Sequence, residues 1–387
     1  MVAGQLLPAM SRPLRVLHCP EVVGGMPGEL ARAERALGAD SRAVAFENSV
    51  YDYAIDEVLY TPETGRLKRE WKRWGLLRRA LTQFDVIHFN FGRTIMPDRT
   101  TELPGRGRLG MFLRRLYAGI FELRDVALLK RMGKRVFVTF QGDDLRQSDF
   151  CGQHFGPRFL QELSTGYYTT ETDARKRWRA AKLAQLVDGM YAVNPDLMYL
   201  LPPTAKFLRY GHINPREWSY RPPPPAHDDG PLVIHAPTHR GVKGTRFVLE
   251  AVDKLRSEGV RFRFQLIEGL PRVEARRLFE HADLLIDQLW LGWYGGLAVE
   301  LMALGRPVIC NIREDGLKFL PPGMAAALPV IRAEPTTLTN VLREWLTTRP
   351  DELMQVGVKS REFVEHWHDP IEVARELLTD YMASGAA

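Results

Sequence analysis

Glycines and a single carboxylate interrupt an otherwise apolar stretch, LLIDQLWLGWYGGLAVELMALGRPVIC, at residues 284–310. Gly295 and Gly296 follow a run of strand length and lead into a helical pattern, so backbone N–H groups there could bind an anion or sugar hydroxyls. Glu300 lies one turn further along among apolar residues, where a carboxylate without a partner is costly. Its two acceptor oxygens suit a vicinal diol such as a ribose, and the alternative is a Glu that caps or pairs within the helix. The stretch therefore predicts a polar ligand at this turn.

Two cations occupy a second candidate site, HAPTHRGVKGT, at residues 235–245. A predicted strand ends at the start of this segment, Arg240 and Lys243 lie on the following loop, and Gly244 opens a helix. Cations beside a helix N-terminus can hold a phosphate through charge-assisted hydrogen bonds, each worth about 1.5–3 kcal/mol. The alternative is two solvated surface cations. The arrangement favours a phosphate site at the carboxyl end of this strand.

A glycine pair, Gly24–Gly25, follows the first predicted strand and precedes a helix. Glycine lets the backbone approach a ligand closely, and the start of a helix attracts anions. The alternative is a plain strand-to-helix turn. Because VGGMPG does not match the pattern G-x-G-x-x-G, the pair does not indicate a dinucleotide-binding site.

Strands and helices alternate along the chain, and this alternation must position the three segments. Alternating strands and helices predict parallel sheets with helices on both faces. Ligands of such sheets bind beyond the carboxyl ends of the strands, which is where each candidate segment lies. The predicted strands cover residues 15–19, 41–48, 85–90, 135–144, 190–193, 206–211, 231–237, 262–269, 283–289 and 307–312.

A proline run, RPPPPAHDDG at residues 221–230, divides the alternation in two. Four consecutive prolines cannot continue a helix or a central strand, so the segment is predicted to be an extended hinge. We expect one doubly wound domain at 1–220 and another at 231–368. The cleft between two such domains is the expected ligand site.

Motifs spread over most of the chain resemble the retaining glycosyltransferases of family 4, which have the GT-B fold. The matching features are GG after the first strand, DVIH, TFQGDD, R-x-x-KG and the run E-x-M-A-x-G-x-PV from Glu300 to Val308, of which the last two are the most specific. The resemblance implies an α/β fold of two Rossmann-like domains that face a central cleft. It also implies that the last helix, within 369–387, crosses back onto the first domain.

The same resemblance implies a reaction, the transfer of a sugar from a nucleoside-diphosphate sugar to an acceptor hydroxyl with retention of configuration. Arg240 and Lys243 would hold the diphosphate, on which negative charge develops, and Glu300 would hold the ribose. The implied donor site also includes Gly24, Gly25, Thr238, Glu268, Gly295, Gly296 and Leu297. The implied acceptor site lies near His88, Asn90, Gln141, Gly142 and Asp143.

Two positions depart from the family pattern. Gly292 stands eight residues before Glu300, where the family usually has a Glu that touches the donor sugar, and Gln141 stands where a His is usual. The part that holds the nucleobase also looks shortened. The sugar, the nucleobase and the acceptor, whether a small molecule, a glycan or a lipid-linked group, are therefore unassigned. A nucleotide-sugar epimerase of related fold and a non-catalytic nucleotide-sugar-binding protein stay open as alternatives.

Positive charge is concentrated in the first part of the chain. Residues 1–215 hold 32 lysines and arginines against 23 acidic residues, whereas the remainder holds 21 against 24. Residues 66–84 and 111–135 mix cations with apolar residues at helical spacing, which would let them contact an anionic membrane. The alternative is that their tryptophans pack into the first domain and their cations are solvated. No nucleic-acid-binding motif accompanies the charge, so we expect no nucleic-acid partner.

Cysteine usage and hydropathy exclude several other classes. Cys19, Cys151 and Cys310 show no paired spacing, which argues against a disulfide framework and against a cysteine zinc site. No apolar run is long enough for a transmembrane helix, and the start lacks a signal-peptide pattern. We expect a cytoplasmic protein, or one held peripherally on the inner membrane face. Asp143–Asp144 is not a D-x-D pair, and we expect no metal and no cofactor besides the nucleotide-sugar co-substrate.

Overall fold

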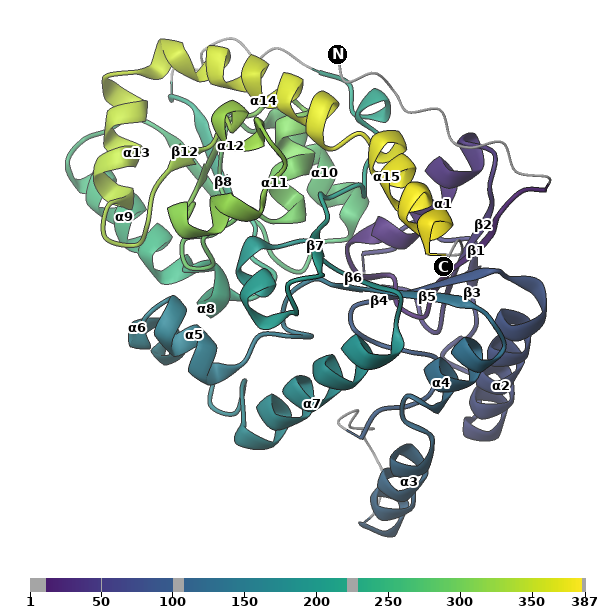
Figure 1. Cartoon of the computed structure of the whole chain (residues 1–387). Helices are drawn as coiled ribbons and strands as arrows, with labels where there is room; N and C mark the ends of the chain where they lie inside the picture. Colours follow the sequence, from purple (N-terminus) through teal and green to yellow (C-terminus); the bar gives the residue numbers. More distant parts are fainter. Residues whose placement is uncertain (1–11, 50, 100–107, 221–228, 385–387) are drawn as a thin grey trace.

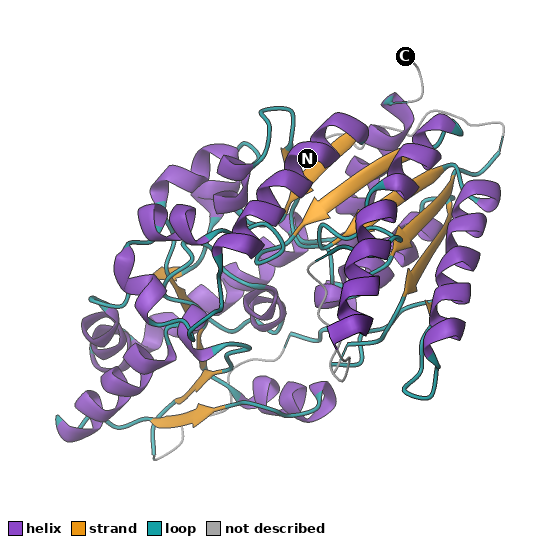
Figure 2. Cartoon of the chain, turned by 90° about the horizontal axis from the view of Figure 1, so that it is seen from below, coloured by secondary structure: helices purple, strands orange, loops and turns teal. Residues whose placement is uncertain are grey.

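Two parallel β-sheets, each covered by helices on both faces, make up the computed structural model, which describes residues 12–49, 51–99, 108–220 and 229–384 (Figures 1 and 2). The first sheet has seven strands: β1 (Arg15–Cys19), β2 (Asp40–Ala45), β3 (Glu57–Val58), β4 (Val86–Asn90), β5 (Arg135–Phe140), β6 (Gly189–Ala192) and β7 (Lys206–Phe207). The second sheet has five: β8 (Leu232–His235), β9 (Arg263–Leu266), β10 (Leu284–Ile286), β11 (Val308–Cys310) and β12 (Ile331–Arg332).

The strand orders are those of doubly wound sheets. The first sheet runs β3-β2-β1-β4-β5-β6-β7 and the second β12-β11-β10-β8-β9, and the neighbouring strands pair in parallel. In each sheet the chain starts near the middle and winds first to one edge and then to the other. The carboxyl ends of the strands at this reversal form the usual place for a ligand.

Helices connect the strands in both halves. Those of the first half are α1 (Met26–Ala36), α2 (Arg66–Gln83), α3 (Arg108–Phe121), α4 (Arg124–Arg131), α5 (Ser148–His154), α6 (Pro157–Gln161) and α7 (Thr170–Leu186). Those of the second half are α8 (Arg240–Lys243), α9 (Thr245–Ser257), α10 (Arg272–His281), α11 (Gly296–Ala303), α12 (Met324–Ala327), α13 (Leu338–Thr347), α14 (Leu353–Trp367) and α15 (Pro370–Ala383). Short 3₁₀ turns lie at Val23–Gly25, Pro195–Leu200, Pro215–Glu217, Glu314–Phe319 and Pro350–Glu352.

Alternate residues of the central strands supply two cores in the first half. Leu17 and Ile87 pack with α2, α4 and α7, whereas Val16 and Val86 pack with α1 and α15. Every residue of β4 is buried, which explains why apolar residues occur on both faces of the strand. Its two polar residues are His88 and Asn90. In the second half, α10, α11 and α14 cover one face of the sheet and α9 and α13 the other.

The last helix, α15, returns to the first sheet, as expected, and lies beside α1 (Figure 1). Leu377 and Tyr381 are fully buried there, and the Tyr381 hydroxyl is hydrogen-bonded to Nδ1 of His88. The Tyr191 hydroxyl donates to Oδ2 of Asp380 at 2.8 Å, and Arg135 Nη1 donates to the carbonyl of Tyr381 at 2.7 Å. The end of the chain therefore completes the first half of the fold.

Local differences from the expected elements have simple causes. β3 and β12 are two-residue edge strands, which are too short to give a periodic pattern, and they were not expected. The strand expected at 206–211 ends at Phe207. The helix expected from Lys243 onward is divided at Gly244, whose φ of 77° is left-handed, so α8 and α9 are separate helices. Residues 221–228 of the expected hinge lie outside the described residues, and the domain limits stay predictions.

Three findings concern the cysteines, membrane-spanning helices and metal-binding groups of the described residues. Cys19, Cys151 and Cys310 are buried and free. Across the described ranges, no helix is both long enough and apolar enough to cross a membrane. In the same ranges, His, Cys, Asp and Glu side chains form no group of three or more that could hold a metal ion.

Replacing Leu377 by alanine should destabilise the protein, because it leaves a cavity between α15 and the first sheet. Buried Leu-to-Ala changes cost about 2–5 kcal/mol. Thr379→Ala on the same helix is the control, since Thr379 is exposed and should change stability by no more than about 0.5 kcal/mol. Urea unfolding of both variants measures the difference, and equal stabilities would mean that α15 is not part of the core.

Candidate functional site

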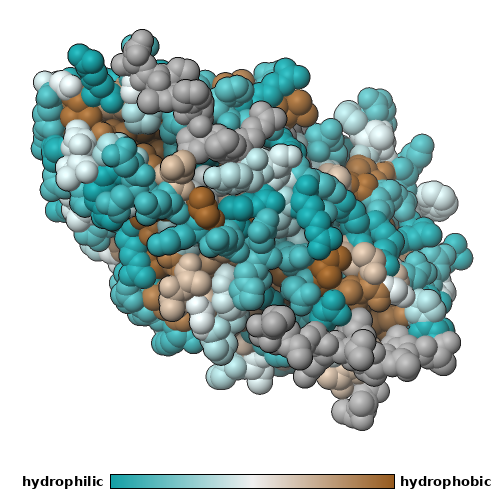
Figure 3. Space-filling model, turned by 90° about the horizontal axis from the view of Figure 1, so that it is seen from above, coloured by the Kyte–Doolittle hydropathy of each residue, from teal (hydrophilic) through white to brown (hydrophobic). Residues whose placement is uncertain are grey.

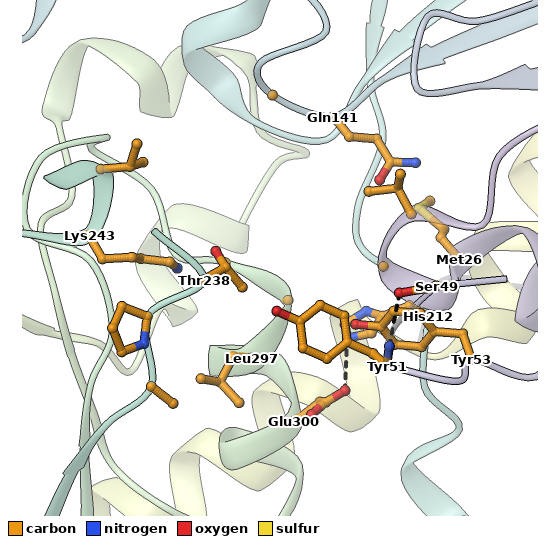
Figure 4. A pocket seen from close by; sticks show the side chains of 18 of the residues that line it. Met26, Ser49, Tyr51, Tyr53, Gln141, His212, Thr238, Lys243, Leu297 and Glu300 are labelled. Atoms are coloured by element: carbon orange, nitrogen blue, oxygen red, sulfur yellow. Dashed lines mark hydrogen bonds and ion pairs between the residues drawn. The ribbon is translucent and has the colours of Figure 1, made fainter. Parts of the chain in front are cut away.

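A cavity of about 670 Å³ lies between the carboxyl ends of the two sheets (Figure 4). Its walls come from the segments that follow β1, β2, β5 and β6 on one side and β8, β9 and β10 on the other. This volume is in the range of cavities that bind small molecules. The position between two doubly wound sheets is the one expected from the sequence.

An ion pair organises the wall formed by the second half of the chain. Nζ of Lys243 lies 2.7 Å from Oδ1 of Asp287, and the backbone N–H of Gly295 donates to Oδ2 of the same carboxylate at 2.7 Å. The Asp287 side chain is 1% exposed, so this carboxylate is held inside the wall, while Lys243 lines the cavity. A Cβ at Gly295 would lie 3.0 Å from Nζ of Lys243. Glycine at this position therefore makes room for the ammonium group.

The start of α11 and a carboxylate one turn later share the same wall. Gly296 begins the helix, its N-cap Gly295 makes no side-chain cap, and both glycines line the cavity. Glu300 is 7% exposed and lines the cavity, with Oε1 3.9 Å from Nε2 of His212 (Figure 4). A Cβ at Gly296 would lie 3.3 Å from that same Nε2. The two glycines thus bring a helix N-terminus, a cation and a carboxylate close together.

On the opposite wall, Gln141 faces the glycine turn after β1. Gly24 has a φ of 66°, and a Cβ built on it would be 3.8 Å from Oε1 of Gln141. The main chain of Gln141 is fixed, because its carbonyl accepts from Nδ2 of Asn194 at 2.6 Å and its N–H donates to Asp144. Its Nε2 is buried without a hydrogen-bond partner among the described residues. Gln141 lines the cavity, and its side-chain amide lies beside the glycine turn.

Asp143 and Asp144, adjacent in sequence, have different environments. Asp143 lines the cavity and accepts hydrogen bonds from the hydroxyls of Tyr167 and Tyr168, the latter at 2.6 Å. Asp144 accepts the N–H of Gly142 at 2.6 Å. Burial raises the pKa of Asp144 to about 6, although the backbone hydrogen bonds to its carboxylate oppose that rise. Asp143 thus belongs to the cavity wall, whereas Asp144 holds the loop that forms it.

Most residues singled out from the sequence line this one cavity. They come from both halves of the chain: Gly24, Gln141, Gly142, Asp143, Thr238, Lys243, Glu268, Gly295, Gly296, Leu297 and Glu300. The structure thus brings together the three segments that the sequence marked separately. Their roles in binding or catalysis stay predictions.

Four expected residues are not among those that line the cavity. His88 and Asn90 are buried in β4, where His88 bonds Tyr381 and the hydroxyl of Thr139, at 2.7 Å for the latter. Gly25 lies against the ring of Tyr53. The side chain of Arg240 is 60% exposed and forms a double hydrogen bond with Glu268, which itself lines the cavity.

Gly292 has a structural reason to be glycine. Its φ is 70°, and a Cβ would lie 2.5 Å from Cγ of Arg313, so the stem of that arginine covers the position. Gly292 is not among the residues that line the cavity, although Leu291 is. The next residues, Trp293 and Tyr294, are buried, and the Tyr294 hydroxyl lies 2.8 Å from Nε2 of His368. Much of the aromatic run that follows β10 is therefore core.

Several residues of the cavity wall were not expected from the sequence. His212, which lines the cavity, follows the short strand β7, and Asp287, which lies behind the wall and holds Lys243, directly follows β10. Asp287 stands just beyond a strand end, the kind of position that marked the segments of Gly295 and Lys243. A further set lies in the segment after β2, where no motif pointed to function: Glu47, Asn48, Ser49, Tyr51 and Tyr53.

Solved structures resemble this fold over nearly its whole length. The chain is similar to sucrose-phosphate synthase from Thermosynechococcus elongatus (14% identity, TM-score 0.59, covering 96% of this chain and 99% of that one). It is similar to Anabaena HepE, solved with UDP-glucose (11% identity, TM-score 0.56, covering 96% of this chain and 99% of that one). It is also similar to the catalytic domain of starch synthase IV from Arabidopsis thaliana, solved with ADP and acarbose (10% identity, TM-score 0.58, covering 97% of this chain and 100% of that one). No family profile and no curated protein sequence matches the chain.

These structural matches confirm the expected fold class. The chain has the GT-B arrangement, in which two Rossmann-like sheets face a central cleft. At identities of 10–14% the likeness concerns the fold, and the residues of the cavity must carry any argument about chemistry.

Gly292→Ala should destabilise the protein more than Gly259→Ala does. Both glycines have a left-handed φ, 70° and 81°, but a Cβ at Gly259 meets nothing within 4 Å, whereas one at Gly292 meets Arg313. Gly259→Ala measures the cost of a left-handed backbone at a residue with a Cβ, about 1 kcal/mol. Any further loss of stability in Gly292→Ala measures the clash between the new Cβ and Arg313. Chemical unfolding measures both, and equal losses would mean that Arg313 moves aside freely.

The free energy of unfolding of the wild type, relative to that of Asp144→Asn, should decrease as the pH is raised from about 4 to about 6. A carboxyl whose pKa is raised to about 6 in the folded state binds a proton more tightly there than in the unfolded chain. That preference stabilises the wild type fully below about pH 4 and is lost as the pH rises through about 6. Unfolding both proteins across this range gives the difference, and a constant difference would contradict the raised pKa.

Proposed function

We propose that the protein is a glycosyltransferase that moves a sugar from a nucleoside-diphosphate sugar to an acceptor hydroxyl with retention of configuration. The observation that carries the proposal is one cavity wall on which the Lys243 ammonium, the N-terminus of α11 and the Glu300 carboxylate lie together. A cation and free N–H groups suit a diphosphate. A carboxylate beside them suits the two vicinal hydroxyls of a ribose.

Lys243 and the glycine loop would stabilise the leaving diphosphate. Negative charge grows on this group as the bond to the sugar breaks, and donors already in place stabilise it without rearranging. The carboxylate of Asp287 supports both donors, since it binds Nζ of Lys243 and the N–H of Gly295. An oxygen of the leaving diphosphate would take the proton of the acceptor hydroxyl. We assign Arg240 an indirect part, because its guanidinium holds Glu268 at the wall of the cavity.

The acceptor would bind against the first half of the chain. Gln141, Gly142 and Asp143 lie on that wall, and the buried Nε2 of Gln141 has a hydrogen bond to give. We assign no acceptor contact to His88 or Asn90, because both are buried in β4 behind this wall. The donor class is supported by proteins of the same fold: HepE was solved with UDP-glucose, and starch synthase IV with ADP.

The test is a panel of nucleoside diphosphates and their sugars, first by thermal shift and then by turnover. A ligand that binds only the folded state raises the melting temperature. Acceptor-stimulated release of the nucleoside diphosphate, with a product whose anomeric configuration matches the donor, supports the proposal. Interconversion of the donor without net release would instead identify an epimerase. Binding with neither reaction would identify a non-catalytic binding protein.

Lys243→Ala and Glu300→Ala should each weaken donor binding by about one to two orders of magnitude. Each removes a charge-assisted hydrogen bond of about 1.5–3 kcal/mol. Calorimetry with the best ligand of the panel measures the change. Lys254→Ala and Glu274→Ala are the matched controls, since they remove the same charges from exposed positions of the same half. Donor affinity unchanged in both site variants would remove the site assignment.

A further inference from the structure

Exposed hydrophobic side chains gather on three neighbouring helices of the first half. Nine of the sixteen large hydrophobic residues that are exposed in the described ranges belong to α2, α3 and the end of α4. They are Leu67, Trp71, Trp74, Phe112, Leu113, Leu116, Ile120, Leu128 and Met132. Contiguous apolar surface of this kind marks a contact with another molecule or a membrane.

The exposed residues follow the helical period, so they form faces. Leu67, Trp71 and Trp74 recur at spacings of four and three on α2, and the four residues of α3 lie within 112–120 at spacings of one, three and four. Leu67 is 89% exposed and Trp71 76% exposed, so neither packs into the first half of the chain. The sequence alternative, in which the tryptophans of 66–84 are core residues, is therefore wrong for Trp71.

Aromatic contacts join the two faces into one surface. Nε1 of Trp74 donates to the hydroxyl of Tyr117 at 3.1 Å, and the rings of Trp74 and Phe121 meet edge to face at 5.3 Å. We call the exposed residues of α2 and α3 the α2–α3 face. It lies at the lower end of the molecule in Figure 1, where α3 projects from the body. The face at the opposite end, seen in Figure 3, is mainly hydrophilic, with hydrophobic residues in small separate groups.

Only some of the cations on α2, α3 and α4 have acidic partners among the described residues. Arg69, Arg73 and Arg79 of α2 are paired with Glu47, Glu70 and Glu57. Six other exposed cations have no carboxylate within ion-pair distance among the described residues: Arg66, Lys68, Arg78, Arg115, Arg124 and Arg131. The surface therefore combines large apolar side chains with positive charge that no carboxylate of the described ranges pairs with.

We propose that the α2–α3 face binds the surface of an anionic phospholipid membrane. Exposed tryptophan, phenylalanine and leucine enter the boundary between headgroups and acyl chains, and unpaired lysine and arginine attract anionic headgroups. Charge complementarity selects this occupant over a second copy of the chain, because two copies of the face would bring like charges together. The face is separate from the cavity, so membrane binding stands or falls independently of sugar transfer.

Sedimentation of the full chain with lipid vesicles tests the proposal. We expect binding to vesicles that contain phosphatidylglycerol, weakening as salt is raised, and at least tenfold weaker binding to pure phosphatidylcholine. The double variant Trp71→Ser/Leu116→Ser should lower the partition coefficient at least tenfold. Lys68→Gln/Arg78→Gln should lower it less and should reduce its dependence on salt.

The matched control is Val273→Ser/Met354→Ser, which removes two exposed hydrophobic residues from the second half, 67% and 54% exposed. It should bind vesicles like the wild type, and all variants should keep the wild-type melting temperature because the changed side chains are exposed. Equal binding to both kinds of vesicle, no binding at low salt, or an equal loss in the control would overturn the proposal. So would light scattering that shows a dimer of the wild type broken by Trp71→Ser/Leu116→Ser, since the face would then bind a second copy.

Discussion

The cavity depends on one carboxylate, Asp287, that is almost completely buried. Asp287 takes the ammonium of Lys243 on one oxygen and the N–H of Gly295 on the other, so it fixes a side chain from the β8 segment against a loop from the β10 segment. Burying a carboxylate is costly unless its partners stay in place, and here both partners are themselves part of the wall. Glycine at 295 leaves room for the ammonium, since a Cβ there would lie 3.0 Å from Nζ of Lys243. A single acid thus determines where the positive charge of the site can lie.

The hydrogen-bond chain behind this wall connects it to the end of the protein. The Tyr294 hydroxyl meets Nε2 of His368, and the other ring nitrogen, Nδ1, meets the carbonyl of Tyr210 at 2.8 Å. Burial lowers the pKa of His368 to about 3, which keeps the ring neutral and able both to donate and to accept. His368 is thus the junction between the β10 loop, the segment that carries His212, and the start of α15. Tyr294 of the glycine-rich stretch belongs to this junction, while Gly295 and Gly296 line the cavity.

The fold was predictable from the sequence because its central strands are mostly apolar and are separated by helical patterns. The strand at 85–90 and the helix at 370–382 were expected within a residue or two. The site was predictable only in part. A residue beyond the end of a strand can be found by its position, as Gly295 and Lys243 were, and Asp287 could have been found in the same way. The direction of a side chain depends on distant partners: Arg240 turns outward to Glu268, and His88 turns to Tyr381, almost three hundred residues away.

The return of α15 has a consequence for how the protein is made. One face of the first sheet is covered by α1 and by residues 370–383, the last described helix of the chain. A ribosome that has synthesised all seven strands of that sheet has not yet made the helix that seals it. Nascent first halves therefore emerge with an uncovered apolar surface and must wait for the entire second half before they are finished. The order of synthesis therefore places the helix that completes this face after the whole second half of the chain.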